Sequence, residues 1–231
     1  MSGRALNVRR LGRIGYAEAL ALQESLVEAH HAGRGVDTLL LLEHEPVITL
    51  GRDAKSENVL HTPEVLAALG VDLVRTDRGG DATFHGPGQI VGYPILDLSP
   101  DFRDIRKFVT ALENVMLDTL RHYGLEGGVM AKHPGVWLFG PDRKIGAIGA
   151  RVRRWVTNHG FALNVNTSLD YFDLIVPCGI REKGVTSLAR ELGRDVLLQD
   201  VEHILATQVA SKFGRELVWD AEQGSNGPSV T

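Results

Sequence analysis

The segment from residue 135 to residue 165 restricts the fold more than any other part of the chain, because it holds three strand-like runs separated only by short turns. These runs read GVWLF, KIGAIGARVR and HGFALNV. Strands with such short connections form an antiparallel meander. With the second corner centred near Trp155, residue numbers paired across the last two strands add up to about 310, which predicts Lys144 near Asn166 and Arg151 near His159. A slip of one residue would exchange the two faces.

Helical patterns precede and follow this meander. Apolar residues recur at helical spacing over residues 16–31, 103–123 and 197–213, and a short helix is predicted over 62–69. Helices around mostly antiparallel strands indicate an α+β (mixed α/β) fold, which we expect to be a single domain over residues 1–220 followed by a disordered tail over 221–231. The other predictions are strands over 37–51 with a break at Pro46, over 71–76 and over 90–98. A glycine-rich loop is expected over 78–92, and a loop with a short helical turn over 184–193.

The composition is that of an ordinary globular protein, with 43% hydrophobic and 23% charged residues among 231. A net charge of -4 does not favour nucleic acid as a partner, which would call for a strongly basic face. No apolar run reaches the length of a membrane span, and the N-terminus has no signal-peptide pattern, so we expect a cytoplasmic protein without a membrane partner. No zinc or calcium motif occurs, and no metal is predicted.

Cys178 is the only cysteine, and it lies in IVPCGI after an apolar strand-like run. A lone thiol forms no disulfide within the chain, and a thiol is an intrinsically strong nucleophile. Position alone favours a packed cysteine that acts as a small hydrophobe. Cys178 is therefore a candidate nucleophile, and the neighbouring motifs decide between the two interpretations.

The segment RGGDATFHGPGQ is dense in glycine, which lets a backbone approach a ligand closely. It does not match a phosphate-binding loop, because no Lys-Ser/Thr follows the glycines, and its spacing is not that of a dinucleotide fingerprint. An ordinary surface loop is the alternative. With Arg78 at one end and His85 inside, we expect a ligand held by backbone amides and apolar walls.

Lys144 opens a strand directly after a turn, and small residues follow it at Gly146, Ala147 and Gly149. Side-chain bulk is therefore missing where a ligand would lie beside the sheet. A lysine with its reference pKa of about 10.4 is protonated at neutral pH, so a catalytic role needs burial or positive neighbours, for which Arg143 and Arg151 are candidates. A solvated lysine at a strand end is the alternative. We expect His159 to support the structure or orient substrate rather than to transfer protons.

Three motifs in this chain, taken together, resemble those of a known protein family. RGGDATFHGPGQIVGYPILDL, then GVWLFGPDRKIGAIGARVRRWVTNHGFALNVN, then IVPCGI followed by GVTSL, resemble the lipoyl(octanoyl) transferase family in order and spacing over about residues 10 to 215. The first ten residues and the chain after about Trp219 fall outside the resemblance. The family's fold is that of the biotin and lipoate protein ligases, a mixed α/β domain built around a largely antiparallel sheet.

The resemblance implies transfer of an octanoyl group from acyl carrier protein to a specific lysine of a lipoyl domain, in lipoate biosynthesis. It implies a thioester on Cys178, with Lys144 as general acid and base, and no cofactor. The substrate-binding residues that follow from it are Arg78, Gly79, Gly80, Asp81, His85, Gly86, Gly146, Ala147, Ile148, Gly149, His159, Gly160 and Ala162.

The partners implied are acyl carrier protein carrying octanoyl-phosphopantetheine, the lipoyl domains of 2-oxoacid dehydrogenase complexes, and the glycine cleavage H protein. Acidic partners of this kind would be attracted by basic residues. The candidates are the segment RVRRW, together with Arg103, Arg106 and Lys107. A solvated charged strand edge explains the same residues without any partner.

Other functions are also compatible with these motifs. An ATP-dependent lipoate or biotin ligase shares the expected fold but forms an adenylate, so it needs no nucleophilic cysteine. A non-catalytic protein that binds acyl groups or lipoyl domains would leave Cys178 merely packed. A thiol redox sensor is less favoured, because the chain has no resolving cysteine. The preferred acyl chain length, the acceptor domain and the oligomeric state do not follow from the sequence.

Overall fold

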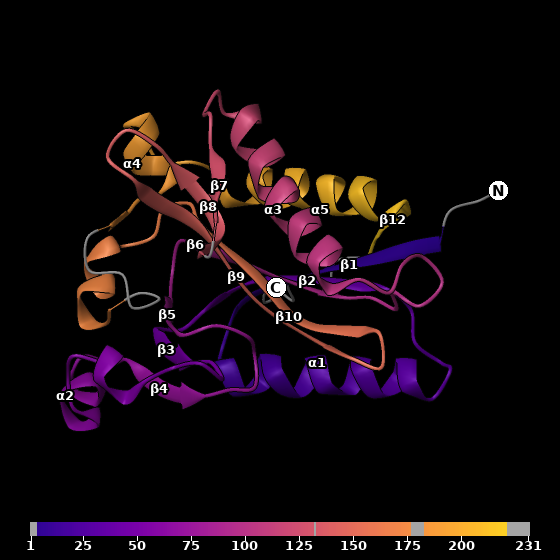
Figure 1. Ribbon diagram of the computed structural model, residues 1–231, viewed down its shortest axis with the longest axis horizontal. Coiled ribbons are helices and arrows are strands. Elements are labelled where there is room, and N and C mark those ends of the chain that lie inside the picture. Colours follow the sequence, from indigo (N-terminus) through magenta and orange to yellow (C-terminus); the bar gives the residue numbers. More distant parts are fainter. Residues whose placement is uncertain (1–3, 132, 177–182, 221–231) are drawn as a thin grey trace, which may run out of the picture.

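The computed structural model describes residues 4–131, 133–176 and 183–220. A large twisted sheet forms the centre of the fold (Figure 1). The strands run in the order β12-β1-β2-β6-β10-β9-β8-β7, and β11 pairs with β9. The contacts from β2 through β7 along this order are antiparallel, whereas β1 pairs in parallel with β2 and β12. The strands are β1 (Arg4–Ile14), β2 (Thr38–His44), β6 (Gln89–Ile95), β7 (Gly128–Met130), β8 (His133–Leu138), β9 (Arg143–Arg153), β10 (Val156–Asn164), β11 (Gly184–Val185) and β12 (Arg215–Trp219).

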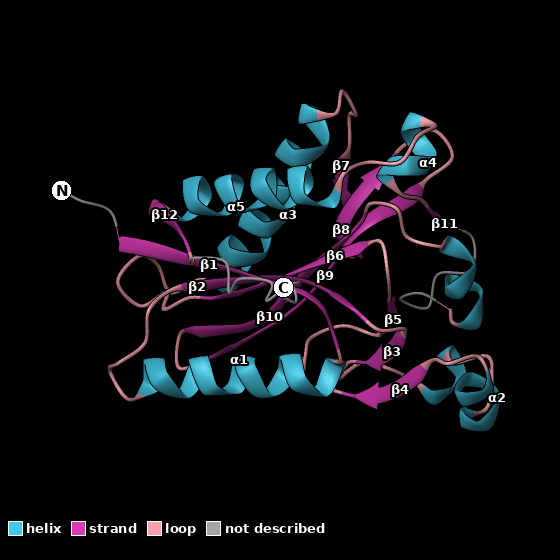
Figure 2. Ribbon diagram, turned by 180° about the vertical axis from the view of Figure 1, so that it is seen from behind, coloured by secondary structure: helices cyan, strands magenta, loops and turns pink. Residues whose placement is uncertain are grey.

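Helices cover both faces of this sheet. In Figure 1, α3 (Ile105–His122) and α5 (Leu198–Phe213) lie above the sheet, and α1 (Tyr16–His31) lies below it. Figure 2 shows the same layers from behind, with α4 (Leu188–Leu192) near the end of the sheet that carries β7. The predicted α+β fold, with a mostly antiparallel sheet flanked by helices, is confirmed.

A second, smaller sheet lies beside α1. It has the order β4-β3-β5, formed by β4 (Asp72–Arg75), β3 (Val47–Leu50) and β5 (Ala82–His85), and α2 (Pro63–Ala68) packs at its edge. Pro46 separates β2 from β3, so the predicted break in the strand sends the chain from the large sheet to the small one. The expectation that residues 78–92 form a loop is wrong in part, because β5 pairs with β3 and β6 begins at Gln89.

Burial on both faces of the large sheet stabilises these layers. Met116 and Leu120 of α3 and Leu205 and Val209 of α5 are completely buried against one face. Ala19 and Val27 of α1 pack against the other face. Burying one such aliphatic side chain contributes about 1.5–3 kcal/mol, so these two layers stabilise the sheet that contains β9 and β10, the strands that carry much of the site.

The corner between β9 and β10 determines which residues of the site face each other. Paired residues add up to 309, as in Gly149 with Gly160, so the predicted register was one residue off. Arg151 therefore lies opposite Asn158, and His159 lies opposite Ala150. The cause is a two-residue turn at Arg154 and Trp155, which both have positive φ (48° and 65°), the conformation of a tight hairpin turn.

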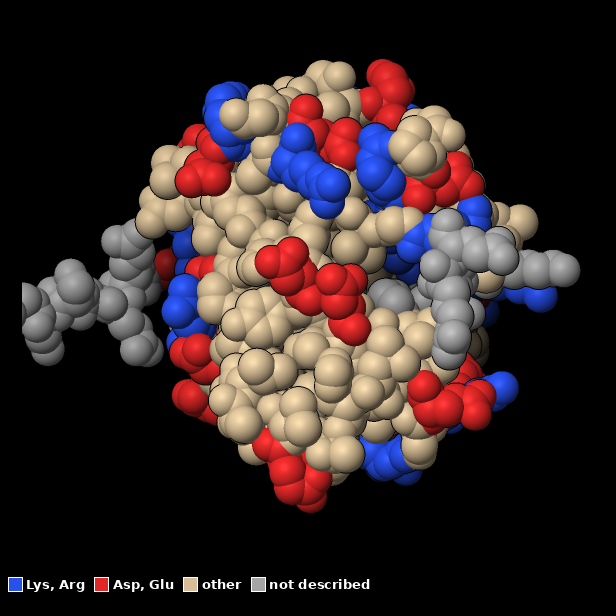
Figure 3. All heavy atoms as spheres, turned by 90° about the vertical axis from the view of Figure 1, so that its left-hand side faces the viewer, with Lys and Arg blue, Asp and Glu red and all other residues tan. Residues whose placement is uncertain are grey.

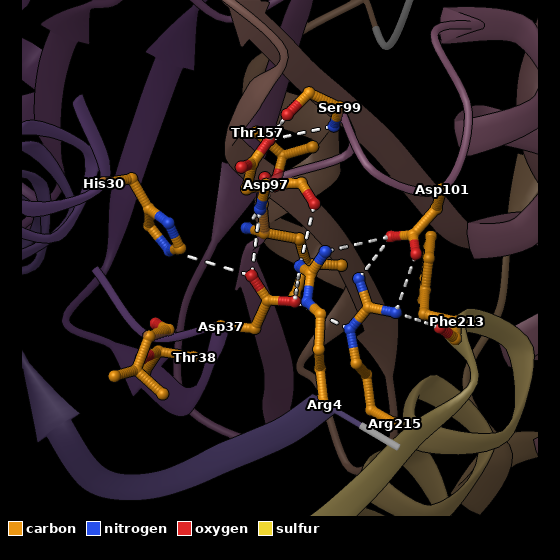
Figure 4. A network of polar contacts seen from close by, with 12 residues as sticks. Arg4, His30, Asp37, Thr38, Asp97, Ser99, Asp101, Thr157, Phe213 and Arg215 are labelled. Atoms are coloured by element: carbon orange, nitrogen blue, oxygen red, sulfur yellow. Dashed lines mark hydrogen bonds and ion pairs between the residues drawn. The ribbon is translucent and has the colours of Figure 1, made fainter. Parts of the chain in front are cut away.

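A buried ionic network ties the first strand to the last (Figure 4). Asp37 accepts a hydrogen bond from Arg215 Nε at 2.7 Å and another from Arg4, and its other oxygen accepts from the backbone of Asp97 at 2.9 Å. The side chains of Asp37 and Arg215 are each only 2% exposed. This network stabilises the edge of the sheet where β1 pairs in parallel with β2 and β12.

None of the helices in the described part of the chain combines the length and the apolar character needed to cross a membrane. Within the same residues, no cluster of three or more His, Cys, Asp or Glu side chains has the arrangement of a metal site.

Candidate functional site

A cavity lies between the large sheet and the segment that carries β5. Strands β6, β9 and β10 form one side, and Thr83 and Phe172 are among the residues on the other. Most of the predicted substrate-binding residues line it, and they come from three separate parts of the chain. They are Arg78, Gly80, Asp81, His85, Gly146, Ala147, Ile148, Gly149, His159, Gly160 and Ala162. Lys144, the predicted general acid and base, lines the cavity as well.

Two predicted residues do not line the cavity. The backbone N–H of Gly79 donates to Ala150 O at 3.2 Å, which attaches the glycine-rich segment to β9. A side chain at Gly86 would collide with the ring of Phe84, because an added Cβ would lie 2.5 Å from it. Both residues therefore shape the cavity wall without contributing to its surface. The predicted nucleophile, Cys178, lies outside the described residues.

Small residues meet across β9 and β10 where the cavity runs. Gly149 pairs with Gly160, and Ala147 pairs with Ala162. An added Cβ on Gly149 would lie 2.9 Å from Cδ of Arg78, so a larger residue there would displace the arginine. The absence of bulk is therefore what allows the glycine-rich segment to approach the sheet.

Arg78 holds that segment in place. Its guanidinium donates to the carbonyl oxygens of Thr49 and Asp81, both at 2.7 Å, and to the hydroxyl of Thr49 at 2.9 Å. The residue is 6% exposed. Gly80, with φ of +89°, turns the backbone next to it in a conformation that favours glycine. Through these hydrogen bonds, Arg78 links β3 to the glycine-rich segment.

Lys144 is buried, with 8% of its surface exposed. Its Nζ lies 5.1 Å from the ring centroid of Trp137, its partner across β8 and β9, within the range of a cation–π contact. Lys183 Nζ lies 5.9 Å from the same ring. The interpretation of Lys144 as a solvated strand-end lysine is wrong, because packing against Trp137 removes it from solvent.

The arginines expected to act on Lys144 are engaged elsewhere. Arg143 forms an ion pair with Glu191 at 3.0 Å, and Arg151 pairs with Asp77 beside His159. The segment after residue 182 instead reaches Lys144 directly, because Val185 pairs with it and Thr186 N donates to its carbonyl at 2.9 Å. On the other side of residues 177–182, Val176 N donates to Asn58 O at 2.8 Å.

A chain of buried polar groups crosses the cavity wall near His85. His85 Nδ1 lies 2.7 Å from Gln89 Oε1, and Gln89 Nε2 donates to Asn164 Oδ1 at 2.9 Å. Asn164 in turn donates to Thr186 O at 3.0 Å. Neither Gln89 nor Asn164 was predicted as a site residue. Asn164 is a polar residue inside the apolar run FALNV, which is a signal that could have marked it, whereas Gln89 directly follows the glycines of the GPG turn and carries no such signal.

His159 has an unusual backbone for a residue other than glycine, with φ of +56°. Its N–H donates to Gln23 Oε1 at 2.9 Å and to Asn158 Oδ1 at 2.8 Å, which stabilises this conformation. Nε2 lies 2.8 Å from Asp77 Oδ1. Tyr16 and Tyr93, which sequence reasoning did not select, also line the cavity, and the ring of Tyr93 lies 6.4 Å from that of His159.

Three histidines around this part of the cavity are neutral at pH 7. Burial lowers the pKa of His85 to about 3 and the pKa values of His44 and His159 to about 4. Nearby positive charge of Arg78 adds to the effect at His159. The cavity therefore offers neutral hydrogen-bonding groups at these positions.

This burial predicts a pH-dependent stability. An unfolded histidine titrates near pH 6.5, so between about pH 6.5 and 4 the unfolded chain binds more protons than the folded one. The stabilisation is complete above pH 6.5 and is lost as the pH falls, by on the order of 1 kcal/mol per pH unit for each histidine. Urea unfolding at pH 7.5, 6 and 5 measures this, and His85→Gln should give a shallower dependence. Equal stability at pH 7.5 and 5 would contradict it.

The fold matches that of the biotin and lipoate protein ligases. A lipoate-protein ligase A bound with ATP has a TM-score of 0.71 at 19% identity, covering 96% of this chain and 90% of the other. Biotin protein ligase from Aquifex aeolicus, in complex with biotin and ATP, has a TM-score of 0.54 at 15% identity, covering 90% and 70%. At such identities the similarity concerns the fold alone.

The family follows from sequence comparison. The model of the lipoyl protein ligase A/B catalytic domain matches residues 15–210, and the chain belongs to this family. It is 51% identical to an octanoyltransferase of Rubrobacter xylanophilus, covering 94% of this chain and 95% of the relative. It is 50% identical to an octanoyltransferase of Myxococcus xanthus, over 92% of this chain but only 61% of that relative's length. The predicted family and the predicted class, an acyltransferase, are confirmed by these relatives.

Proposed function

We propose that the protein transfers an octanoyl group from acyl carrier protein to a lysine of a lipoyl domain, through a thioester on Cys178. One observation carries the proposal: a buried lysine, Lys144, opens onto a cavity whose sheet side carries small residues along β9 and β10. Such a cavity suits an unbranched acyl chain, and octanoyltransferases are the relatives at about 50% identity.

In the first half of the reaction, Lys144 takes the proton of the Cys178 thiol, and the thiolate attacks the thioester carbonyl of the donor. The carbon–sulfur bond to phosphopantetheine breaks, and Lys144 returns the proton to the departing sulfur. One thioester replaces another, so the step needs no ATP. Both sides of the segment that holds Cys178 support this pairing. Val176 bonds to Asn58, whose side chain donates to Asp81 of the cavity wall at 2.6 Å, and Lys183 lies over the same Trp137 ring as Lys144.

In the second half, the amine of the acceptor lysine attacks the Cys178 thioester. Lys144 removes a proton from that amine and delivers it to the cysteine sulfur as the carbon–sulfur bond breaks. The products are an amide and the free thiol, so the enzyme is regenerated. Backbone N–H groups near the reacting carbonyl would stabilise the oxyanion of each tetrahedral intermediate.

The donors and acceptors proposed are octanoyl-acyl carrier protein, the lipoyl domains of 2-oxoacid dehydrogenase complexes and the glycine cleavage H protein. The side of the molecule that carries α2 and α4 has a broad uncharged area over α2, with charged groups of both signs around it (Figure 3). Leu60, Val65 and Leu69 are 43–51% exposed there. The basic residues Arg151 and Arg153 are paired with Asp77 and Glu28, so they offer less free charge for docking than expected.

Intact-mass measurement tests the thioester directly. Incubation of the protein with octanoyl-acyl carrier protein, without nucleotide, should add one octanoyl group, and hydroxylamine should remove it. Cys178→Ser should lose this hydroxylamine-labile adduct completely. An unchanged adduct in the serine variant, or an adduct that forms only with ATP, would contradict the proposal and favour an ATP-dependent ligase.

A further inference from the structure

Asn164, the last residue of β10, points a buried amide to the side of the sheet where the cavity lies. Phe161 and Leu163 pack into the core that contains α3 and α5. The alternate residues Ala162 and Asn164 therefore point to the opposite side, and both line the cavity. Asn164 is 6% exposed. Neither half of the proposed reaction uses this amide.

Two main-chain carbonyls fix the orientation of the Asn164 amide. A carbonyl oxygen only accepts, so the atom that faces Thr186 O at 3.0 Å is the nitrogen, Nδ2. Oδ1 accepts from Gln89 Nε2 at 2.9 Å, and the same Gln89 nitrogen donates to Phe84 O at 3.1 Å. An amide nitrogen carries two N–H groups. One is bound to Thr186, and the second has no acceptor in the described part of the chain, so a ligand in the cavity can accept from it.

The amine of Lys144 and the amide of Asn164 flank the same part of β9. Lys144 leans towards β8, because its Nζ lies 5.1 Å from the Trp137 ring and a Cβ added to Gly135 would lie 2.8 Å from its Cε. Asn164 is on β10, the strand on the other side of β9. Thr186 contacts both residues, since its N–H donates to Lys144 O at 2.9 Å. Strands are about 4.8 Å apart, so β8 and β10 are separated by about 10 Å, which leaves room for a thioester between the amine and the amide.

Small residues continue from Asn164 along the same face of β10. Ala162 and Gly160 line the cavity, at about 7 and 14 Å from Asn164 for a rise of about 3.4 Å per residue. An extended octanoyl chain measures about 9 Å, for seven bonds of about 1.5 Å each. With its carbonyl at Asn164, the chain therefore extends past Ala162 and ends short of Gly160.

We propose that the second N–H of Asn164 Nδ2 binds the acyl carbonyl oxygen and stabilises the oxyanion in both halves of the reaction. The inference rests on the proposed function, which places the reacting carbonyl close to Lys144. When the nucleophile attacks, an electron pair of the carbonyl double bond moves to the oxygen, and it returns when the carbon–sulfur bond breaks. The hydrogen bond is strongest in these tetrahedral intermediates, so it raises the rate more than the affinity for the donor.

Asn164→Asp tests this role, because aspartate keeps an oxygen for Gln89 Nε2 but has no second donor. We expect octanoyl transfer from acyl carrier protein to Cys178, in a single turnover at saturating donor, to slow by about 10²- to 10³-fold. The donor concentration that gives half the maximal rate should change by less than about threefold. Asn164→Leu should slow the step as much, which separates the lost donor from a new charge near Lys144. A rate within about fivefold of wild type in either variant would overturn the proposal.

Asn166→Asp is the matched control, two residues further along the chain. The Asn166 amide also binds the main chain, with Nδ2 donating to Val196 O at 2.8 Å and Oδ1 accepting from Val196 N at 3.0 Å. Asn166 is not among the described residues that line the cavity. The same chemical change there should weaken the fold and leave the folded protein with most of the wild-type rate. An equal loss of rate in Asn166→Asp would assign the effect to general packing and overturn the role of Asn164.

Infrared spectroscopy of an isotope-labelled octanoyl adduct reports the hydrogen bond itself. A hydrogen bond weakens the carbonyl double bond, so its stretch should lie at lower frequency in the wild type than in Asn164→Asp, which long incubation also acylates. Equal frequencies in the two adducts would disprove the role of Asn164 and leave the thioester, and with it the proposed function, standing. A wild-type protein that forms no adduct would disprove the proposed function and this inference together.

Discussion

Replacing Lys144 by arginine is expected to lower the rate of octanoyl transfer by about 10²- to 10⁴-fold, the usual contribution of a general acid–base group. Arginine keeps the positive charge and the contact with Trp137, but it cannot give up its proton at any working pH. A role in charge alone would therefore survive the substitution, whereas proton transfer would not. Single-turnover assays of both half-reactions, with the adduct followed by mass, measure the effect.

Lys183, which lies over the Trp137 ring as Lys144 does, provides the control. Lys183 Nζ is 5.9 Å from the Trp137 centroid and forms an ion pair with Asp142, so Lys183→Arg changes the same surroundings without touching Lys144. It should keep at least half of the wild-type rate. Lys144→Met, which is shorter and uncharged, separates loss of the proton carrier from crowding by arginine. A normal rate in both Lys144 variants would rule out this residue as the acid and base.

Replacing Asp37 by alanine is expected to destabilise the fold by about 3–5 kcal/mol, the cost of removing one partner from a buried ion pair. Arg215 would stay buried at 2% exposure after losing its 2.7 Å contact with Asp37, and of its two acidic partners in the described part of the chain it would retain Asp101. The backbone N–H of Asp97 would lose its acceptor as well. Urea unfolding at pH 7.5 measures the change in the free energy of unfolding.

An exposed ion pair provides the comparison for Asp37. Glu28 and Arg153 are 3.5 Å apart, with side chains 64% and 52% exposed, so Glu28→Gln should cost at most about 1 kcal/mol. Asp37 is not among the residues that line the cavity, so the fraction of Asp37→Ala that remains folded should transfer octanoyl groups normally. A destabilisation below about 1 kcal/mol would show that Arg215 finds solvent or another partner when Asp37 is removed.

The meander illustrates what local patterns can determine. The strand-like runs and short turns between residues 135 and 165 predict β8, β9 and β10 in their observed order, because neighbouring strands need no long-range information to pair. The register between β9 and β10, by contrast, does not follow from these local patterns. It depends on positive φ at Arg154 and Trp155, two residue types that give no sign of such a turn, so the prediction missed it by one residue.

Elements with distant partners were harder to predict. β5 lies within a glycine-rich segment and is a strand only because β3, over thirty residues earlier, supplies its hydrogen bonds. β1 and β12 were not predicted, and they pair with each other in parallel from opposite ends of the chain. Their sequences mix charged and apolar residues, and the buried network around Asp37 that secures this edge joins residues far apart in sequence.

The sequence by itself determined the family, the mixed α/β fold and the list of residues that could face a ligand, because motif order and hydrophobic periodicity are properties of the chain alone. The tertiary structure decided which of these residues meet. It buried Lys144 against Trp137, engaged Arg143 and Arg151 in other ion pairs, and brought Gln23, Asp77 and His159 together from three separate parts of the chain. Hydrogen-bond partners and burial arise only when distant segments pack, and this burial keeps His85 and His159 neutral at pH 7.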